Sequence, residues 1–283
     1  MSEADAIEKS VRGPVTRSWL LHDLQALGVK HGMLLMAHCS LSQLGWVIGG
    51  AVTVLSALRD AVGEAGTLVL PTFTTANTDP ARWQHPPVPE EWKNLVREES
   101  PPYDPATWLS REMGAASDLF LRLPGVVRSG HPSVSWAAQG PLAEKVVGEH
   151  LWGQALGERS PLGACYALGA YVLSLGTVKT TVLHLAEWRA AYPGKHYYAQ
   201  GAAVLLDGRR QWVAYQALQG TNSDFEQLRG DFMRDPSNST CWSAGTVGYG
   251  AARLFEVRAL VDYAVEWMPR HRSSPCPDSA PEQ

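Results

Sequence analysis

The stretch MLLMAHCSLSQLGWVIGGAVTVLSALRDAVGEAGTLVLPTFT, residues 33–74, decides the fold. Its first part, 33–39, is an apolar run that predicts a buried strand, and its last part, 67–74, predicts a second one. Between them, apolar residues recur at helical spacing over 51–62, and Gly63 ends the helix. Strand, helix and strand in this order form a βαβ unit, which predicts a parallel sheet.

The segments on either side of this unit extend it into an α/β protein. We expect helices at 15–29 (capped by Thr16), 111–123, 141–149, 181–191 and 251–268, a short strand with turns in 126–140, a strand at 169–176, and an antiparallel hairpin at 202–218 around the Asp207-Gly208 turn. The predicted fold class is therefore α/β, with a mixed, largely parallel central sheet flanked by helices, an antiparallel hairpin and a Pro-rich insertion.

The chain is interpreted as one domain over residues 1–269. Within it, residues 75–110 are too rich in proline for a long helix or a central strand. A Pro-rich excursion of this length in a compact domain usually serves a function, so we expect it to border a binding site. The polar, Pro- and Ser-rich segment 270–283 predicts a disordered tail.

Composition excludes several classes of protein. Charged residues are 18% of the 283 residues, and the net charge of −4 comes without a basic block, so we expect no nucleic acid partner. No apolar run approaches the ~20 residues of a membrane span, and the polar start MSEADAIEKS is unlike a signal peptide. We therefore expect a cytoplasmic protein without a membrane partner. The four cysteines form no CxxC pair and the sequence has no HExxH motif, so we expect no metal.

The helix predicted at 181–191 carries the most informative pair of residues. His184 and Glu187 are three apart, so their side chains share one face of the helix, near the carboxyl edge of the sheet where open α/β folds bind ligands. A carboxylate can hold one ring nitrogen of a histidine and leave the other free to accept a proton. Thr181, one turn earlier, is placed to donate a hydrogen bond to a developing oxyanion. The competing interpretation is a structural hydrogen bond.

The loop SLSQLGWVIGG, Ser40–Gly50, follows a predicted strand and opens a predicted helix. Glycines let backbone N–H groups approach an anion, and a helix N-terminus adds positive potential, so a coenzyme pyrophosphate suits this loop. The loop matches neither GxGxxG nor GxxxxGK[ST], so a Rossmann or P-loop site is not supported. A plain glycine-containing turn is the alternative.

Two further positions have open interpretations. Cys39 lies beside this loop, either as a nucleophile paired with His184 or as an ordinary buried cysteine. Arg128, with Ser129 and His131, forms a polar cluster that predicts either a phosphate or carboxylate contact or a surface salt bridge.

Taken in order, these pieces resemble the aminoglycoside 3-N-acetyltransferase family of antibiotic N-acetyltransferases. The matching stretches are HCSLSQLGWVIGGAVTVLSALRDAVGEAGTLVLPTFT at 38–74, NTDPARWQHPPVPEEW at 77–92, YDPATWLSREMGAASDLF at 103–120, PGVVRSGHPSVSWAAQG at 124–140, LHLAEWRA at 183–190 and ARLFEVRALVDYAV at 252–265. The resemblance implies transfer of an acetyl group from acetyl-coenzyme A to the 3-amino group of a 2-deoxystreptamine aminoglycoside, which confers antibiotic resistance.

The resemblance also implies roles for individual residues. The catalytic residues it implies are His184 as general base, Glu187 as its acidic partner, and Thr181. The coenzyme-binding residues are Ser40, Leu41, Ser42, Gly49, Gly50, Pro71, Thr72 and Phe73, and we add Arg128 from the polar cluster. The substrate-binding residues are Asp79, Trp83 and Glu90. The expected ligands are acetyl-coenzyme A and an aminoglycoside, bound by a monomer or a homodimer.

The chain departs from the family pattern at two places. Cys39 replaces the serine of HSSLS, and the turn GTVKTTVLHLAE is short, with Lys179 where the family has an uncharged or acidic residue. We expect a positive charge at Lys179 to repel a cationic substrate. The alternatives are an acetyltransferase of the same fold that acts on a different primary amine, and a non-catalytic aminoglycoside-binding protein.

Overall fold

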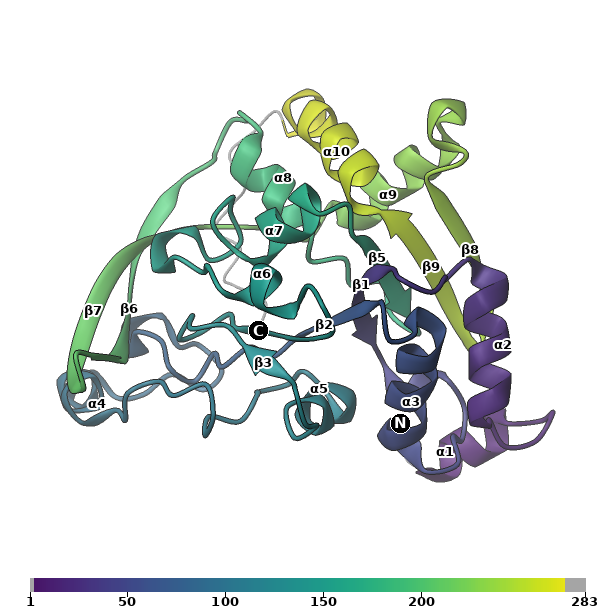
Figure 1. The fold of residues 1–283 in the computed structure, drawn as a ribbon. Helices are drawn as coiled ribbons and strands as arrows, with labels where there is room; N and C mark the ends of the chain where they lie inside the picture. The colour runs from purple at the N-terminus through teal and green to yellow at the C-terminus, as the bar shows by residue number, and fades with distance from the viewer. Residues whose placement is uncertain (1–2, 273–283) are drawn as a thin grey trace.

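The computed structural model describes residues 3–272 and is built around a seven-stranded mixed sheet (Figure 1). The order across the sheet is β3-β4-β2-β1-β5-β9-β8. The strands are β1 (Leu34–Cys39), β2 (Thr67–Pro71), β3 (Val127–Arg128), β4 (Trp136–Gln139), β5 (Tyr171–Leu175), β8 (Trp242–Val247) and β9 (Gly250–Glu256). The predicted mixed α/β class is confirmed.

The prediction that the sheet is largely parallel was wrong. Strand β1 pairs in parallel with β2 and β5, but β4 runs antiparallel to β2, and β9 runs antiparallel to β5. The outer pairs β3–β4 and β8–β9 are antiparallel as well. Each outer pair is a hairpin with a short link, which makes its two strands antiparallel, and only the three central strands β2, β1 and β5 are parallel to one another.

Helices cover both faces of the sheet and create two apolar cores. They are α1 (Glu3–Lys9), α2 (Arg17–Leu27), α3 (Gly50–Val62), α4 (Lys93–Glu99), α5 (Ala115–Phe120), α6 (Ala143–Val147), α7 (Pro161–Ala167), α8 (Leu183–Arg189), α9 (Phe225–Arg234) and α10 (Val257–His271). Helices α2, α3 and α5 pack on one face, and α6 to α10 pack on the other. The second face carries the histidine–glutamate helix, α8.

Local sequence signals set the ends of the first helices. Thr16 accepts a hydrogen bond from the Trp19 amide and caps α2, as predicted. Gly28 ends that helix with φ 107°, in the left-handed region that favours glycine. Helix α3 ends at Gly63, also as predicted.

The predicted helix at 251–268 was wrong in its first part. Residues 250–256 form strand β9, and α10 begins only at Val257. Ala252 and Leu254 face one core while Phe255 faces the other, so the burial alternates with the period of a strand. Its hairpin partner β8, at 242–247, was not predicted from the sequence.

The first residues of the predicted tail, 270–272, belong to the folded part of the protein. Helix α10 continues to His271, and the Arg272 side chain is only 8% exposed because it forms two ion pairs. The rest of that segment, 273–283, lies outside the described residues.

The predicted hairpin is confirmed and is longer than expected. It consists of β6 (Tyr197–Leu206) and β7 (Arg209–Leu218), and it forms a separate two-stranded sheet beside the central one (Figure 1). The Pro-rich excursion packs against it: the Tyr103 amide donates to the Ala203 carbonyl (2.8 Å), and the Asn77 side chain also bonds to Ala203. Within residues 3–272, no helix has the length and apolar character needed to cross a bilayer.

Candidate active site

The turn between β5 and α8 is fastened to the sheet by side chains on the face that carries α8. Ser174, on β5, donates to the Lys179 carbonyl (2.7 Å). Buried Arg229, from α9, donates to the Thr180 hydroxyl (3.1 Å). The Thr181 amide donates to Nε2 of His38, on β1 (3.3 Å). These contacts fix where α8 begins.

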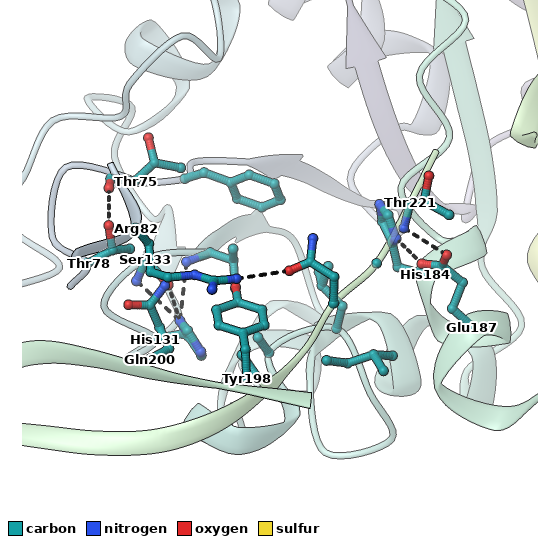
Figure 2. Close-up of a pocket in the computed structure, with 18 of the residues that line it drawn as sticks. Thr75, Thr78, Arg82, His131, Ser133, His184, Glu187, Tyr198, Gln200 and Thr221 are labelled. Carbon is teal, nitrogen blue, oxygen red and sulfur yellow. Dashed lines mark hydrogen bonds and ion pairs between the residues drawn. The ribbon is translucent and has the colours of Figure 1, made fainter. Parts of the chain in front are cut away.

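Helix α8 brings His184 and Glu187 into direct contact, as their spacing predicts. His184 Nδ1 lies 2.5 Å from Glu187 Oε2 (Figure 2). The other oxygen, Oε1, accepts hydrogen bonds from Arg272 Nη1 (2.7 Å) and from the Thr221 amide (3.0 Å). The Glu187 side chain is completely buried, whereas that of His184 is 20% exposed. A buried carboxylate is stable here because each oxygen has charged or polar partners.

The surroundings of Glu187 keep it ionised. Burial raises the pKa of this carboxyl, but the attraction of His184, its hydrogen bond and the charge of Arg272 outweigh that effect, so the pKa is lowered. An ionised carboxylate only accepts hydrogen bonds, so His184 Nδ1 carries the hydrogen. Nε2 of His184 is then the nitrogen with a free lone pair, and it has no hydrogen-bond partner among the residues described.

The segment that covers the dyad leaves no room for a side chain at Gly220. A Cβ there would lie 2.8 Å from Glu187 Oε2 and 3.0 Å from His184 Nδ1. On the neighbouring side, the Phe225 ring lies 5.0 Å from the imidazole. The dyad is thus enclosed by backbone and by an aromatic ring, which orients the imidazole.

His184 and Glu187 line a cavity of about 330 Å³ between α8, the β6–β7 hairpin and the Pro-rich excursion (Figure 2). Its wall is rich in aromatic rings, contributed by Phe73, Trp83, Trp188, Tyr198 and Tyr215. Hydroxyl and amide groups make up most of the polar lining, contributed by Thr75, Thr78, Ser133, Gln200, Gln219, Thr221, Asn222 and Ser223. A cavity with a few polar groups among aromatic rings is typical of a small-molecule site.

The structure places the three predicted substrate-binding residues differently. Trp83 lines the cavity. Asp79 does not: it caps the turn Pro80–Arg82 and forms an ion pair with Arg97 (2.8 Å). Glu90 is also outside the lining, with its side chain 84% exposed and paired with a lysine.

The predicted coenzyme residues fall into two groups. Ser40, Leu41, Ser42, Gly49 and Gly50 lie in the loop from β1 to α3, and the Ser40 amide donates to the Leu175 carbonyl (2.9 Å), which places the loop beside the turn before α8. Both glycines have positive φ, 74° and 56°. The side chains of Ile48 and Val52 leave apolar surface exposed at this end of α3.

The second group follows β2. Pro71 and Thr72 are buried, and Thr72 bonds to Ser135. Phe73 lines the cavity, where its ring meets Trp136 edge-on. Thr181, the predicted oxyanion donor, is not among the lining residues, and His38 occupies its amide. These positions bring the end of β2 and the dyad to one cavity and leave Thr181 at its border.

The guanidinium of Arg128 forms its hydrogen bonds within the protein. Its guanidinium donates to Ser135 Oγ (3.1 Å) and to the carbonyls of Thr72 (2.7 Å), Pro105 and Trp108. It therefore ties the Pro-rich excursion to the ends of β2 and β4. A bound phosphate would have to compete with these contacts.

Cys39 and His184 lie on opposite faces of the sheet. Cys39 packs against the core that carries α2 and α3, whereas its neighbour His38 faces the Trp136 ring on the side of α8. Burial raises the pKa of the Cys39 thiol to about 12, so it stays protonated at neutral pH. The arrangement does not supply a cysteine–histidine nucleophile.

Sequence reasoning missed three residues of the site. Arg272 was assigned to the tail, Gly220 carries no motif, and Arg82 was passed over within the Pro-rich excursion. Each reaches the cavity or the dyad only through the fold, since 85 residues separate Arg272 from Glu187. The single available signal was the position of Arg82 next to the predicted contact Trp83.

Among residues 3–272, no group of three potential metal ligands comes together.

The fold and the site define an α/β protein with a histidine–glutamate dyad at the carboxyl edge of its parallel strands, an arrangement suited to general-base catalysis. A family model described as aminoglycoside 3-N-acetyltransferase matches residues 36–269. The chain belongs to this family, and the expectation of an N3-acetyltransferase is confirmed at that level.

Individual relatives match almost end to end. The YokD protein of Bacillus subtilis, described as aminoglycoside N(3')-acetyltransferase-like, is 39% identical over 92% of this chain and 95% of its own. Its crystal structure superposes with a TM-score of 0.90 over 95% of this chain and 98% of that one, at 37% identity. Aminoglycoside N(3)-acetyltransferase VII of Streptomyces paromomycinus is 36% identical over 93% and 94% of the two chains. The structure of AAC-IIIb with coenzyme A matches at 28% identity and TM-score 0.81, over 94% of this chain and all of that one.

Proposed function

We propose that this protein transfers the acetyl group of acetyl-coenzyme A to the 3-amino group of a 2-deoxystreptamine aminoglycoside, with His184 as general base. The observation that carries the proposal is the contact of His184 Nδ1 with the buried Glu187 carboxylate (2.5 Å), with the ring at the wall of a small-molecule cavity. The family and the coenzyme A complex of a relative support the acetyl donor.

The proposed proton transfer follows from the tautomer of His184. Nε2 accepts the proton of the attacking amine, and the imidazole becomes positively charged. Glu187, ionised and held by Arg272 and the Thr221 amide, stabilises that charge without moving. Coenzyme A leaves as its thiolate, which takes up the proton that His184 removed from the amine, so the imidazole becomes neutral again.

Direct transfer, without an acetyl-enzyme intermediate, is favoured by the position of Cys39. The thiol faces away from the dyad, and its raised pKa of about 12 keeps it a poor nucleophile. Both substrates must then occupy the protein at once. We place the amine in the cavity beside His184 and the coenzyme along the loop Ser40–Gly50, where Ile48 and Val52 offer apolar surface to it.

The developing oxyanion of the tetrahedral intermediate needs a hydrogen-bond donor. The Thr181 amide already donates to His38, so the Thr181 hydroxyl is the group that remains for the developing oxyanion. Thr181→Val keeps the shape of the side chain and removes the hydroxyl. Its effect on turnover, compared with Thr181→Ser, measures this contribution.

The test is release of coenzyme A thiol with a panel of gentamicin-, kanamycin-, neomycin- and apramycin-type substrates. Identification of the product by NMR must show an acetyl group on N3, and initial-rate patterns should intersect, as they do when both substrates bind before reaction. Thiol release no greater than that of the His184→Ala protein would refute the proposal. A stable acetyl-enzyme formed without amine would refute direct transfer.

A further inference from the structure

Arg82 is a cation on the cavity wall that lacks an acidic partner. It ends the short turn Pro80–Arg82, and its guanidinium lies over the Tyr198 ring, 4.1 Å from the centroid. Nη2 donates to Oε1 of Gln219 (3.2 Å), and Figure 2 shows the side chain reaching across the cavity. Among the residues described, no carboxylate lies within ion-pair distance of Arg82.

The carboxylates around the cavity are already neutralised. Of the described residues that line it, Glu187 is the only carboxylate, and it is buried against His184 and Arg272. Asp224, next to the lining residue Ser223, is held by Arg272 at 2.7 Å. Asp79 is likewise paired with Arg97. The wall thus offers a ligand one unpaired positive charge and no unpaired negative one.

The Tyr198 ring does not offer a binding place for a ligand cation that would offset the positive charge of Arg82. Cations bind over the face of a tyrosine ring, but the guanidinium of Arg82 already occupies that place. Lys179, where the sequence predicted repulsion of a cationic substrate, is exposed and does not line the cavity. The positive charge that faces the substrate comes from Arg82 instead.

We propose that Arg82 ranks aminoglycosides by charge: it favours those that carry few ammonium groups and disfavours those, such as neomycin, that carry many. The proposal rests on the proposed function, because it places the reacting amine at His184. An ammonium group near Arg82 is repelled at short range, where the salt of the solution screens little. Hydroxyl groups can instead bond to the Gln200, Gln219 and Thr78 side chains around Arg82.

The experiment is calorimetric binding without acetyl-coenzyme A, which reports on the cavity whether or not transfer occurs. The ligands are 2-deoxystreptamine, with two amines, and neomycin, with six. Arg82→Gln should tighten neomycin binding by about 3- to 10-fold and change the affinity for 2-deoxystreptamine by less than ~2-fold. Arg82→Lys keeps the charge and should retain the wild-type ratio of affinities. Arg209→Gln removes an exposed charge at the hairpin tip and should change neither affinity.

Three outcomes would overturn the proposal. Neomycin affinity that is unchanged or weakened in Arg82→Gln excludes repulsion by this residue. Equal tightening of both ligands shows a change in cavity shape rather than in charge selection. Weaker binding of coenzyme A to Arg82→Gln, with unchanged amine binding, assigns Arg82 to the coenzyme anion. Failure of the proposed function is distinct, because thiol release would then be absent with every amine while the calorimetry still reports charge selection.

Discussion

Two histidines line the same cavity, and the groups on their ring nitrogens give them different chemistry. His184 donates from Nδ1 to the carboxylate of Glu187. His131, on the loop before β4, accepts at Nδ1 from the amides of Ser133 and Val134, both at 3.2 Å. Its Nε2 donates to the Trp152 carbonyl (3.1 Å), so both ring nitrogens are occupied.

The surroundings of His131 and His184 favour different protonation behaviour. Burial lowers the pKa of His131 to about 4, and its neighbour His150, 4.6 Å away between ring centroids, is also lowered by burial. His131 therefore stays neutral, with no free lone pair, and holds the loop before β4 in shape. His184 has an ionised partner and a free Nε2. Both histidines lie on the cavity wall, so it is the hydrogen-bond partners of each ring that determine whether it can accept a proton.

The largest expected effect is a loss of turnover when His184 is replaced, and replacement of His131 at the same cavity is the comparison. His184→Ala removes the proposed general base, and turnover should fall at least ~100-fold, the lower end for loss of such a group. The matched variant is His131→Asn, at the same cavity, which should keep turnover within ~5-fold. Steady-state rates of thiol release give both values. Near-normal turnover of folded His184→Ala would show that His184 is not the base.

A smaller loss of turnover, together with a loss of stability, is expected when Arg272, the cationic partner of Glu187, is replaced. Arg272→Gln leaves a buried carboxylate with one charged neighbour fewer, so the pKa of Glu187 should rise and the free energy of unfolding should drop by about 3 kcal/mol. Turnover should fall ~10-fold, with a smaller change in KM. Arg272→Lys, which keeps a charge, should recover part of both losses. Urea unfolding and kinetics measure them, and wild-type values for Arg272→Gln would mean that this ion pair contributes nothing to the site.

The buried histidines predict loss of stability in acid. The pKa of His38 is lowered to about 3 and that of His131 to about 4, in both cases by burial first. Between these values and ~6.5 the unfolded chain binds more protons than the folded one, so stability falls as the pH falls through this window. Each histidine contributes a slope of up to ~1.4 kcal/mol per pH unit.

Replacement of His131 tests whether this buried histidine is responsible for the loss of stability in acid. His131→Asn should flatten this pH dependence of the free energy of unfolding, measured by urea titration from pH 4 to 7. Ser18→Ala, at an exposed position without a titratable group, is the control and should leave the slope unchanged over the same range. An unaltered slope in His131→Asn would mean that His131 is not the buried neutral group described here.

The smallest effect is expected on the far face of the sheet. Cys39→Ser should keep turnover within ~3-fold, because Cys39 lies on the face away from His184 and direct transfer needs no thiol. Mass spectrometry of the protein after incubation with acetyl-coenzyme A alone should show no acetyl group on Cys39. A large loss of activity, or a trapped thioester, would argue for a two-step route.

Much of the fold follows from local patterns. The βαβ unit at 33–74, the Thr16 cap and the hairpin at Asp207-Gly208 depend on periodicity and turn chemistry, which neighbouring residues set. The prediction was wrong at 250–256, where the choice between helix and strand depended on pairing with β5 and β8. Strand pairing joins distant segments, so a local window does not contain it.

By itself, the sequence determined the family, the α/β class and the dyad, because His184 and Glu187 are three residues apart on one helix and a helix fixes their contact locally. The tertiary structure alone decided that Arg272 contacts Glu187 of the dyad, that Asp79 forms an ion pair with Arg97, and that Arg82 lines the cavity. Those contacts join segments far apart in the chain. Which charges meet, and which are left unpaired, is set by packing rather than by spacing.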